Sequence, residues 1–175
     1  MKKLSGDFYK AAMLTALGVT LGYLFLAVPN VELVTATVFI AGFLLGPLIG
    51  SIVGIVTELI FSVLNPLGIP MPTVLFAQLV GMGFTGSVGG FLQKNGLKRK
   101  TFITRAVILS ITGFFITLVF DILTTLGFVV VIAKGDMHKL LASFLFGASF
   151  YTIHLAVNTI LFATLVPLVL ARLEK

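Results

Sequence analysis

The chain has 175 residues, of which 58% are hydrophobic and only 10% are Asp, Glu, Lys or Arg. Soluble domains carry about a quarter charged residues, so these few charges cannot cover a water-exposed surface. The absence of cysteine excludes a disulfide framework, a thiolate metal site and a cysteine nucleophile. The composition therefore predicts an integral membrane protein, not a soluble enzyme.

Apolar segments follow one another along the chain, interrupted by charges, prolines and glycine clusters. A helix of about 20 residues spans the hydrocarbon layer of a bilayer. No Ala-x-Ala-like cleavage site follows the first segment, so we expect that segment to be retained. The sequence predicts a single all-α membrane domain over residues 1–175, with six transmembrane helices at 8–28, 32–45, 47–64, 73–92, 102–133 and 140–171.

Two turn signals separate the middle segments. Gly46-Pro47 permits a tight turn, because Pro fits the first turn of a following helix. The stretch 65–72 holds three of the six prolines and predicts a stiff loop. Residues 32–64 could alternatively form one kinked helix and a re-entrant piece, which would make the number of crossings odd.

The formal net charge is +6, and the basic residues are distributed as a membrane topology requires, not gathered in one patch. If the two termini and the loop 93–100 share one side, ten of the twelve basic residues lie on that side. The positive-inside rule makes that side the cytoplasm. We therefore expect both termini in the cytoplasm, only Lys134 and Lys139 outside, and no nucleic-acid partner.

Glycines recur every four residues at 42, 46, 50 and 54, which favours close packing of helices, with a sliding surface as the functional alternative. Residues 81–86 match the G-x-G-x-x-G dinucleotide pattern, yet they lie inside an apolar segment and not between a strand and a helix. We expect no nucleotide site there. No G-x-x-x-x-G-K-[ST] motif occurs, so nothing indicates that this chain has its own ATP site.

Polar side chains inside the apolar segments form the candidate binding site. An ionisable group at the bilayer centre costs about 2.5–3.5 kcal/mol, so each such group is a functional hypothesis. Most of these groups share a depth between the midplane and the outer surface, and Tyr151, His154 and Asn158 lie on one helical face. We predict an outward-facing small-molecule site with the candidate residues Glu58, Gln78, Asp121, Thr125, Tyr151, His154 and Asn158.

Other interpretations of these residues stay open. Asp121 and His154 could form a buried structural network, and a proton or ion relay would use similar residues, although the sequence has no evident internal repeat. His154 is the only histidine within an apolar segment, and Asp121 has no second aspartate at the same depth. We therefore expect neither a metal site nor catalytic residues.

Ala12 and Ala16 form a small-x-x-x-small pair on the first predicted helix. Such a pair forms either a contact within the molecule or a docking face for a partner helix. The whole chain resembles the S components of energy-coupling factor (ECF) vitamin transporters. The resemblance rests on this alanine pair, the small size of the chain, the six predicted helices and the lack of an ATP-binding motif. The stretches Glu32-Leu33-Val34-Thr35 and Asn65-Pro66-Leu67-Gly68 are also similar to that family.

The resemblance implies a multi-pass protein of a prokaryotic cell membrane that captures a vitamin or related micronutrient at the outer face. It implies that Ala12 and Ala16 dock on a transmembrane coupling subunit, that two partner ATPase subunits use ATP, and that this chain binds no cofactor itself. It also implies that the protein topples in the membrane to release its ligand.

Two other functions remain: a self-sufficient small-molecule or ion-coupled carrier, and a non-transporting scaffold. Among ligands, cobalamin, pyridoxine and pyrimidine types stay open. The single carboxylate of Asp121 suits a ligand with an amine or hydroxyl groups better than a ligand with several carboxylates.

Overall fold

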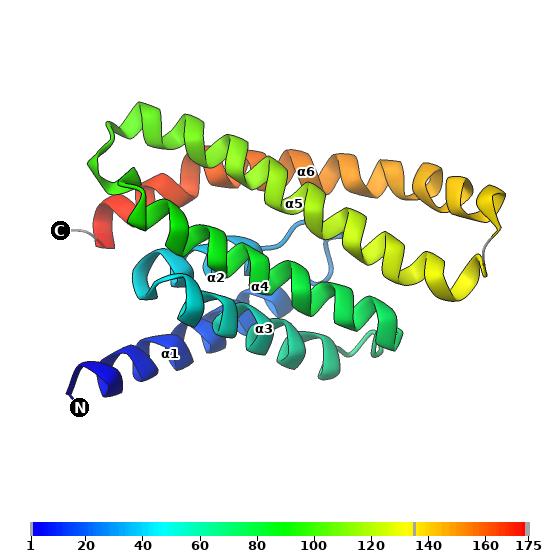
Figure 1. Cartoon of the computed structure of the whole chain (residues 1–175), viewed down its shortest axis with the longest axis horizontal. Coiled ribbons are helices and arrows are strands. Elements are labelled where there is room, and N and C mark those ends of the chain that lie inside the picture. Colours follow the sequence, from blue (N-terminus) through cyan, green and yellow to red (C-terminus); the bar gives the residue numbers. More distant parts are fainter. Residues whose placement is uncertain (1, 135, 174–175) are drawn as a thin grey trace.

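The computed structural model describes residues 2–134 and 136–173, and the regular structure of this part of the chain is helical, which confirms the all-α class (Figure 1). The N- and C-terminal ends lie at the same end of the molecule, and α5 and α6 run side by side along one flank. The elements are α1 (Lys2–Leu24), α2 (Val34–Leu45), α3 (Pro47–Val63), α4 (Pro72–Lys94), the short 3-10 helix η1 (Leu97–Arg99), α5 (Phe102–Ile132) and α6 (Met137–Leu173).

Local sequence signals fix where most of these helices begin. Pro47 and Pro72 are the first residues of α3 and α4, where the missing N–H of proline costs nothing. The Thr101 side chain caps α5 by accepting from the Thr104 N–H at 3.3 Å. Asp136 Oδ1 accepts from the His138 N–H at 2.9 Å at the start of α6. The starts of α3, α4, α5 and α6 therefore follow from the residues that stand there.

The end of α1 lies four residues earlier than the expected residue 28. After Leu24 the chain leaves the helix in tight turns, with the Val28 N–H donating to the Phe25 carbonyl at 2.8 Å. Pro29 follows, and Asn30 adopts a left-handed φ of 59°. Residues 25–33 consequently leave the helix and fold back into α2, which runs in the opposite direction to α1 (Figure 1).

The short helix α2 lies at the centre of the bundle. Ten of its 12 residues are buried, which explains why its sequence is apolar on all sides. Gly46, with φ 91°, turns the chain between α2 and α3, and these two helices then pack against each other. Because α2 contacts α1, α3, α4 and α6, it holds the N-terminal helices onto the α5–α6 pair.

Glycines let α2, α3 and α4 approach to backbone contact. A Cβ on Gly50 would lie 2.6 Å from the Gly86 carbonyl oxygen, and one on Gly54 would lie 2.7 Å from the carbonyl carbon of Met82. Gly42, Gly50, Gly54 and Gly86 therefore serve close packing, as the spacing of the first three predicts. Gly46 differs, since no atom lies within 4 Å of a Cβ built there.

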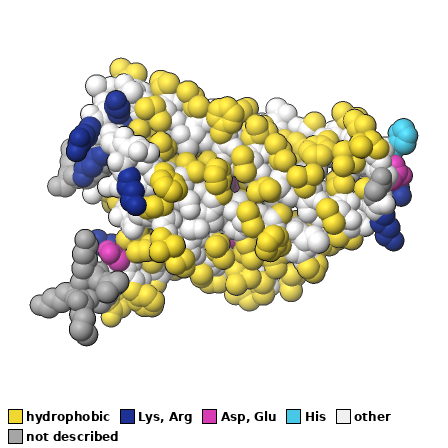
Figure 2. All heavy atoms as spheres, viewed as in Figure 1, with side chains coloured by type: hydrophobic (Ala, Val, Ile, Leu, Met, Phe, Trp, Pro, Cys, Tyr) yellow, Lys and Arg dark blue, Asp and Glu magenta, His cyan; other side chains and the backbone are white. Residues whose placement is uncertain are grey.

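The exterior of the bundle is apolar, with large exposed side chains such as Leu48, Phe76 and Phe146 (Figure 2). Among the described residues, α4, α5 and the stretch Phe150–Leu173 of α6 are long and apolar enough to cross a membrane. The helices α2 and α3 are apolar but shorter, with 12 and 17 residues. These features indicate a multi-pass membrane protein.

Candidate functional site

A cavity of about 210 Å³ lies between the α1–α2 connection and the helices α3 to α6. The folded-back segment 25–33 forms one wall, and the C-terminal half of α3 and the N-terminal half of α4 form another. Phe120 and His154 close it from α5 and α6. The full lining comprises Gly22, Phe25, Leu26, Val28, Pro29, Asn30, Val31, Glu32, Val34, Glu58, Phe61, Gln78, Met82, Phe120 and His154.

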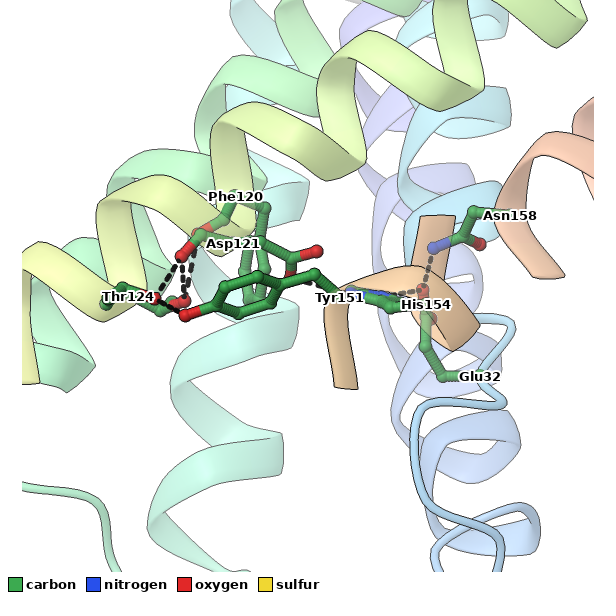
Figure 3. Close-up of polar contacts among 8 residues, drawn as sticks. Glu32, Phe120, Asp121, Thr124, Tyr151, His154 and Asn158 are labelled. Atoms are coloured by element: carbon green, nitrogen blue, oxygen red, sulfur yellow. Dashed lines mark hydrogen bonds and ion pairs between the residues drawn. The ribbon is translucent and has the colours of Figure 1, made fainter. Parts of the chain in front are cut away.

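His154 stands between two carboxylates at the inner wall of this cavity (Figure 3). Its Nδ1 lies 2.8 Å from Asp121 Oδ1, and its Nε2 lies 3.6 Å from Glu32 Oε1. The imidazole is 8% exposed, so water does not compete strongly for these contacts. With an acidic oxygen at each ring nitrogen, the arrangement matches the protonated imidazole, in which both nitrogens donate.

Glu32 is held from three directions. Besides His154, the Asn158 Nδ2 donates to Oε1 at 3.1 Å, and the Thr35 backbone N–H donates to Oε2 at 2.8 Å. Asn158 lies one helical turn after His154 on α6, so both side chains reach the same carboxylate. These contacts fasten the segment before α2 to the middle of α6.

A second polar group comes from α3 and α4. The Ser62 hydroxyl donates to Glu58 Oε1 at 2.9 Å and also lies 3.4 Å from Gln78 Oε1. Glu58 is 3% exposed and lines the cavity. Among the described residues, nothing hydrogen-bonds its second carboxylate oxygen. Glu58 is therefore a buried carboxylate that faces the cavity without a cationic partner in the described chain.

Thr125 and Tyr151 lie apart from the cavity. Their hydroxyls bond to each other, and Thr125 Oγ1 donates to the Asp121 carbonyl at 2.8 Å. Both residues line a different, open pocket of about 530 Å³ between α5 and α6, beside Lys139. They support the backbone at Asp121 but do not face the space that Glu58 faces.

The seven residues selected from the sequence thus divide into three groups. Glu58, Gln78 and His154 line the cavity. Asp121 and Asn158 stand behind it, where they contact His154 and Glu32. The remaining two residues, Thr125 and Tyr151, line the open pocket between α5 and α6.

Glu32 is the site residue that the sequence analysis did not select. It stands at the beginning of an apolar run, where a charge is ordinary, and its partner Asn158 is 126 residues away. A signal did exist, since Glu32 is one of only six acidic residues in the chain and stands two residues before a helix that contains no charged residue. Asn30 and Phe120 also line the cavity without having been selected.

Ala12 and Ala16 lie on α1 and are not part of the cavity wall. Both are exposed and line a groove of about 810 Å³ between α1 and α3. The groove walls are almost entirely apolar and include Phe8, Ile52 and Val56. The two alanines face outward here and not toward a neighbouring helix of the described chain.

Comparison with known proteins gives one match. No curated protein and no solved structure matches the chain. The family model for the substrate-specific component of ECF transporters matches residues 8–170, which is nearly the whole chain. The protein therefore belongs to the family of ECF transporter substrate-specific components, which bind substrates for transport.

Proposed function

We propose that this chain is the S component of an ECF-type ABC importer, which captures a vitamin or related micronutrient and delivers it by docking on a shared energising module. One observation supports this most: the molecule carries a small cavity with polar side chains in its wall and, with no lining residue in common, an exposed apolar groove with small residues. An S component needs both a ligand site and a separate surface for its partner.

In this proposal six helices cross the membrane and both termini face the cytoplasm. The basic side chains support this orientation, because most of those visible in Figure 2 gather at the end where the termini lie. Lys134 and Lys139 stand at the opposite end, near the turn between α5 and α6. The positive-inside rule then directs the end with the α5–α6 turn toward the outside.

The ligand occupies the cavity in contact with Glu58, Gln78 and His154. Asp121 and Asn158 act indirectly, by fixing His154 and Glu32. Segment 25–33 covers the cavity on one side and is held to α6 through Glu32.

The groove between α1 and α3 receives an apolar helix of the transmembrane coupling subunit. At Ala12 and Ala16 the side chains are small enough for a partner backbone to approach closely, which is how membrane helices associate. Two ATPase subunits bound to the coupling subunit supply the energy from ATP.

Substitution on α1 tests this assignment. Ala16→Trp places a large side chain where the partner backbone would lie, so we expect loss of co-purification with the coupling subunit and loss of uptake. Ligand binding should stay unchanged, because the cavity is lined by other residues. The matched control is Ala156→Trp, at an exposed alanine on α6 outside the groove.

Unchanged assembly of Ala16→Trp with the coupling subunit would contradict the docking assignment. Uptake by the purified chain alone in proteoliposomes without ATP would favour a self-sufficient carrier. An S component should bind its ligand in such vesicles but not accumulate it.

A further inference from the structure

The charges around the cavity are unbalanced. Glu32, Glu58 and Asp121 contribute three carboxylates at or directly behind the wall, and His154 contributes the single imidazole. No Lys or Arg is among the described residues that line the cavity. Even with a protonated His154, the carboxylates outnumber the cations of the wall.

Two of the three carboxylates are already engaged. Asp121 holds His154 at 2.8 Å, and Glu32 receives His154, Asn158 and the Thr35 backbone N–H. Among the described residues, Glu58 accepts a hydrogen bond only from the Ser62 hydroxyl, although Glu58 is just 3% exposed. A buried ion without a counterion is strongly unfavourable, so a cation beside Glu58 would be the missing partner.

The remaining walls limit the size and shape of the occupant. A volume of about 210 Å³ lies below the roughly 300 Å³ at which pockets for drug-sized ligands begin. Phe25, Phe61 and Phe120 present aromatic surface, and Phe61 is itself fixed against Tyr23 with ring centroids 5.2 Å apart. Aromatic faces attract both flat rings and cations.

We propose that the cavity selects a small organic cation of about one ring, whose protonated nitrogen pairs with Glu58 while Glu32 stays bound to His154. The inference rests on the proposed function, because it names the substrate class of the same site. The wall charges disfavour a ligand with several carboxylates.

A charge series on one ring tests this selectivity. Benzylamine, benzyl alcohol and benzoate have similar size and differ in charge, and each is titrated calorimetrically into the full chain in lipid nanodiscs at pH 7. We expect benzylamine to bind at least about tenfold more tightly than the other two, since a charge-assisted buried hydrogen bond contributes about 1.5–3 kcal/mol.

Glu58→Gln is the matching variant. Gln keeps the size of Glu and an oxygen that accepts from Ser62, but removes the charge, so benzylamine binding should weaken by about 10- to 100-fold. The control Asp136→Asn removes an acidic charge at the start of α6, outside the cavity, and should leave the affinity unchanged. The probe series on the unaltered chain gives an answer even if Glu58→Gln fails to fold.

Three results would overturn the inference: equal or tighter binding of benzyl alcohol or benzoate, binding of none of the three probes, or unchanged benzylamine affinity in Glu58→Gln. The last result would indicate that Glu58 is neutral and acts as a hydrogen-bond donor. None of these results would contradict the proposed transport role. That role is tested separately, and it would be contradicted if Ala16→Trp left assembly with the coupling subunit unchanged.

Discussion

His154 is the residue on which the polar network depends, because it separates two carboxylates from different parts of the chain. Asp121 comes from α5 and Glu32 from the segment before α2, and both aim an oxygen at the imidazole. One oxygen of Asp121 and one of Asn158 have no hydrogen-bond partner among the described residues. Loss of the imidazole would therefore leave further acceptor oxygens without a donor in this network.

His154→Ala should consequently destabilise the protein by about 3–5 kcal/mol, the usual effect of removing one partner from a buried ion pair. Thermal unfolding followed by circular dichroism in a mild detergent measures the change. His138→Ala, at an exposed position, is the control and should stay within about 0.5 kcal/mol.

A double variant distinguishes charge from packing at this site. Adding Asp121→Asn to His154→Ala removes one of the two uncompensated carboxylates, so we expect part of the lost stability to return. If the double variant were less stable than His154→Ala alone, the ion-pair explanation would be wrong and the imidazole would matter mainly as packing volume.

At the scale of elements, the contact among α2, α3 and α4 depends on glycine. Around Gly86 the neighbours are backbone atoms of Gly50 and Ser51, with the Ser51 nitrogen 3.0 Å from a Cβ built there. Backbone atoms cannot move aside as a flexible side chain can, so whole helices would have to separate to admit a methyl group.

Gly86→Ala should therefore destabilise the bundle by about 1–3 kcal/mol through overpacking, although alanine is the better helix former. Gly6→Ala on α1 is the matched control, because no atom lies within 4 Å of its Cβ position, and it should be neutral or slightly stabilising. Equal thermal unfolding of Gly86→Ala and the unaltered protein would show that α2, α3 and α4 are less tightly packed than described.

At the scale of the whole molecule, local patterns predicted the helical class and the role of the glycine spacing, since both depend on residues a few positions apart. The turn at Gly46-Pro47 was readable for the same reason. The geometry of the site could not be predicted from the sequence, because Glu32 contacts Asn158, which is 126 residues away. The shared helical face also grouped Tyr151 with His154, although these two residues line different pockets.

The separation of the cavity from the α1–α3 groove is what a two-partner transport protein requires. Native mass spectrometry of the protein, purified in mild detergent from its own host, tests this central claim most directly. We expect a bound small molecule that carries a positive charge at pH 7, together with a transmembrane coupling subunit and two ATPase subunits. A chain that carries neither ligand nor partners at good expression, and that transports alone in proteoliposomes without ATP, would contradict the account.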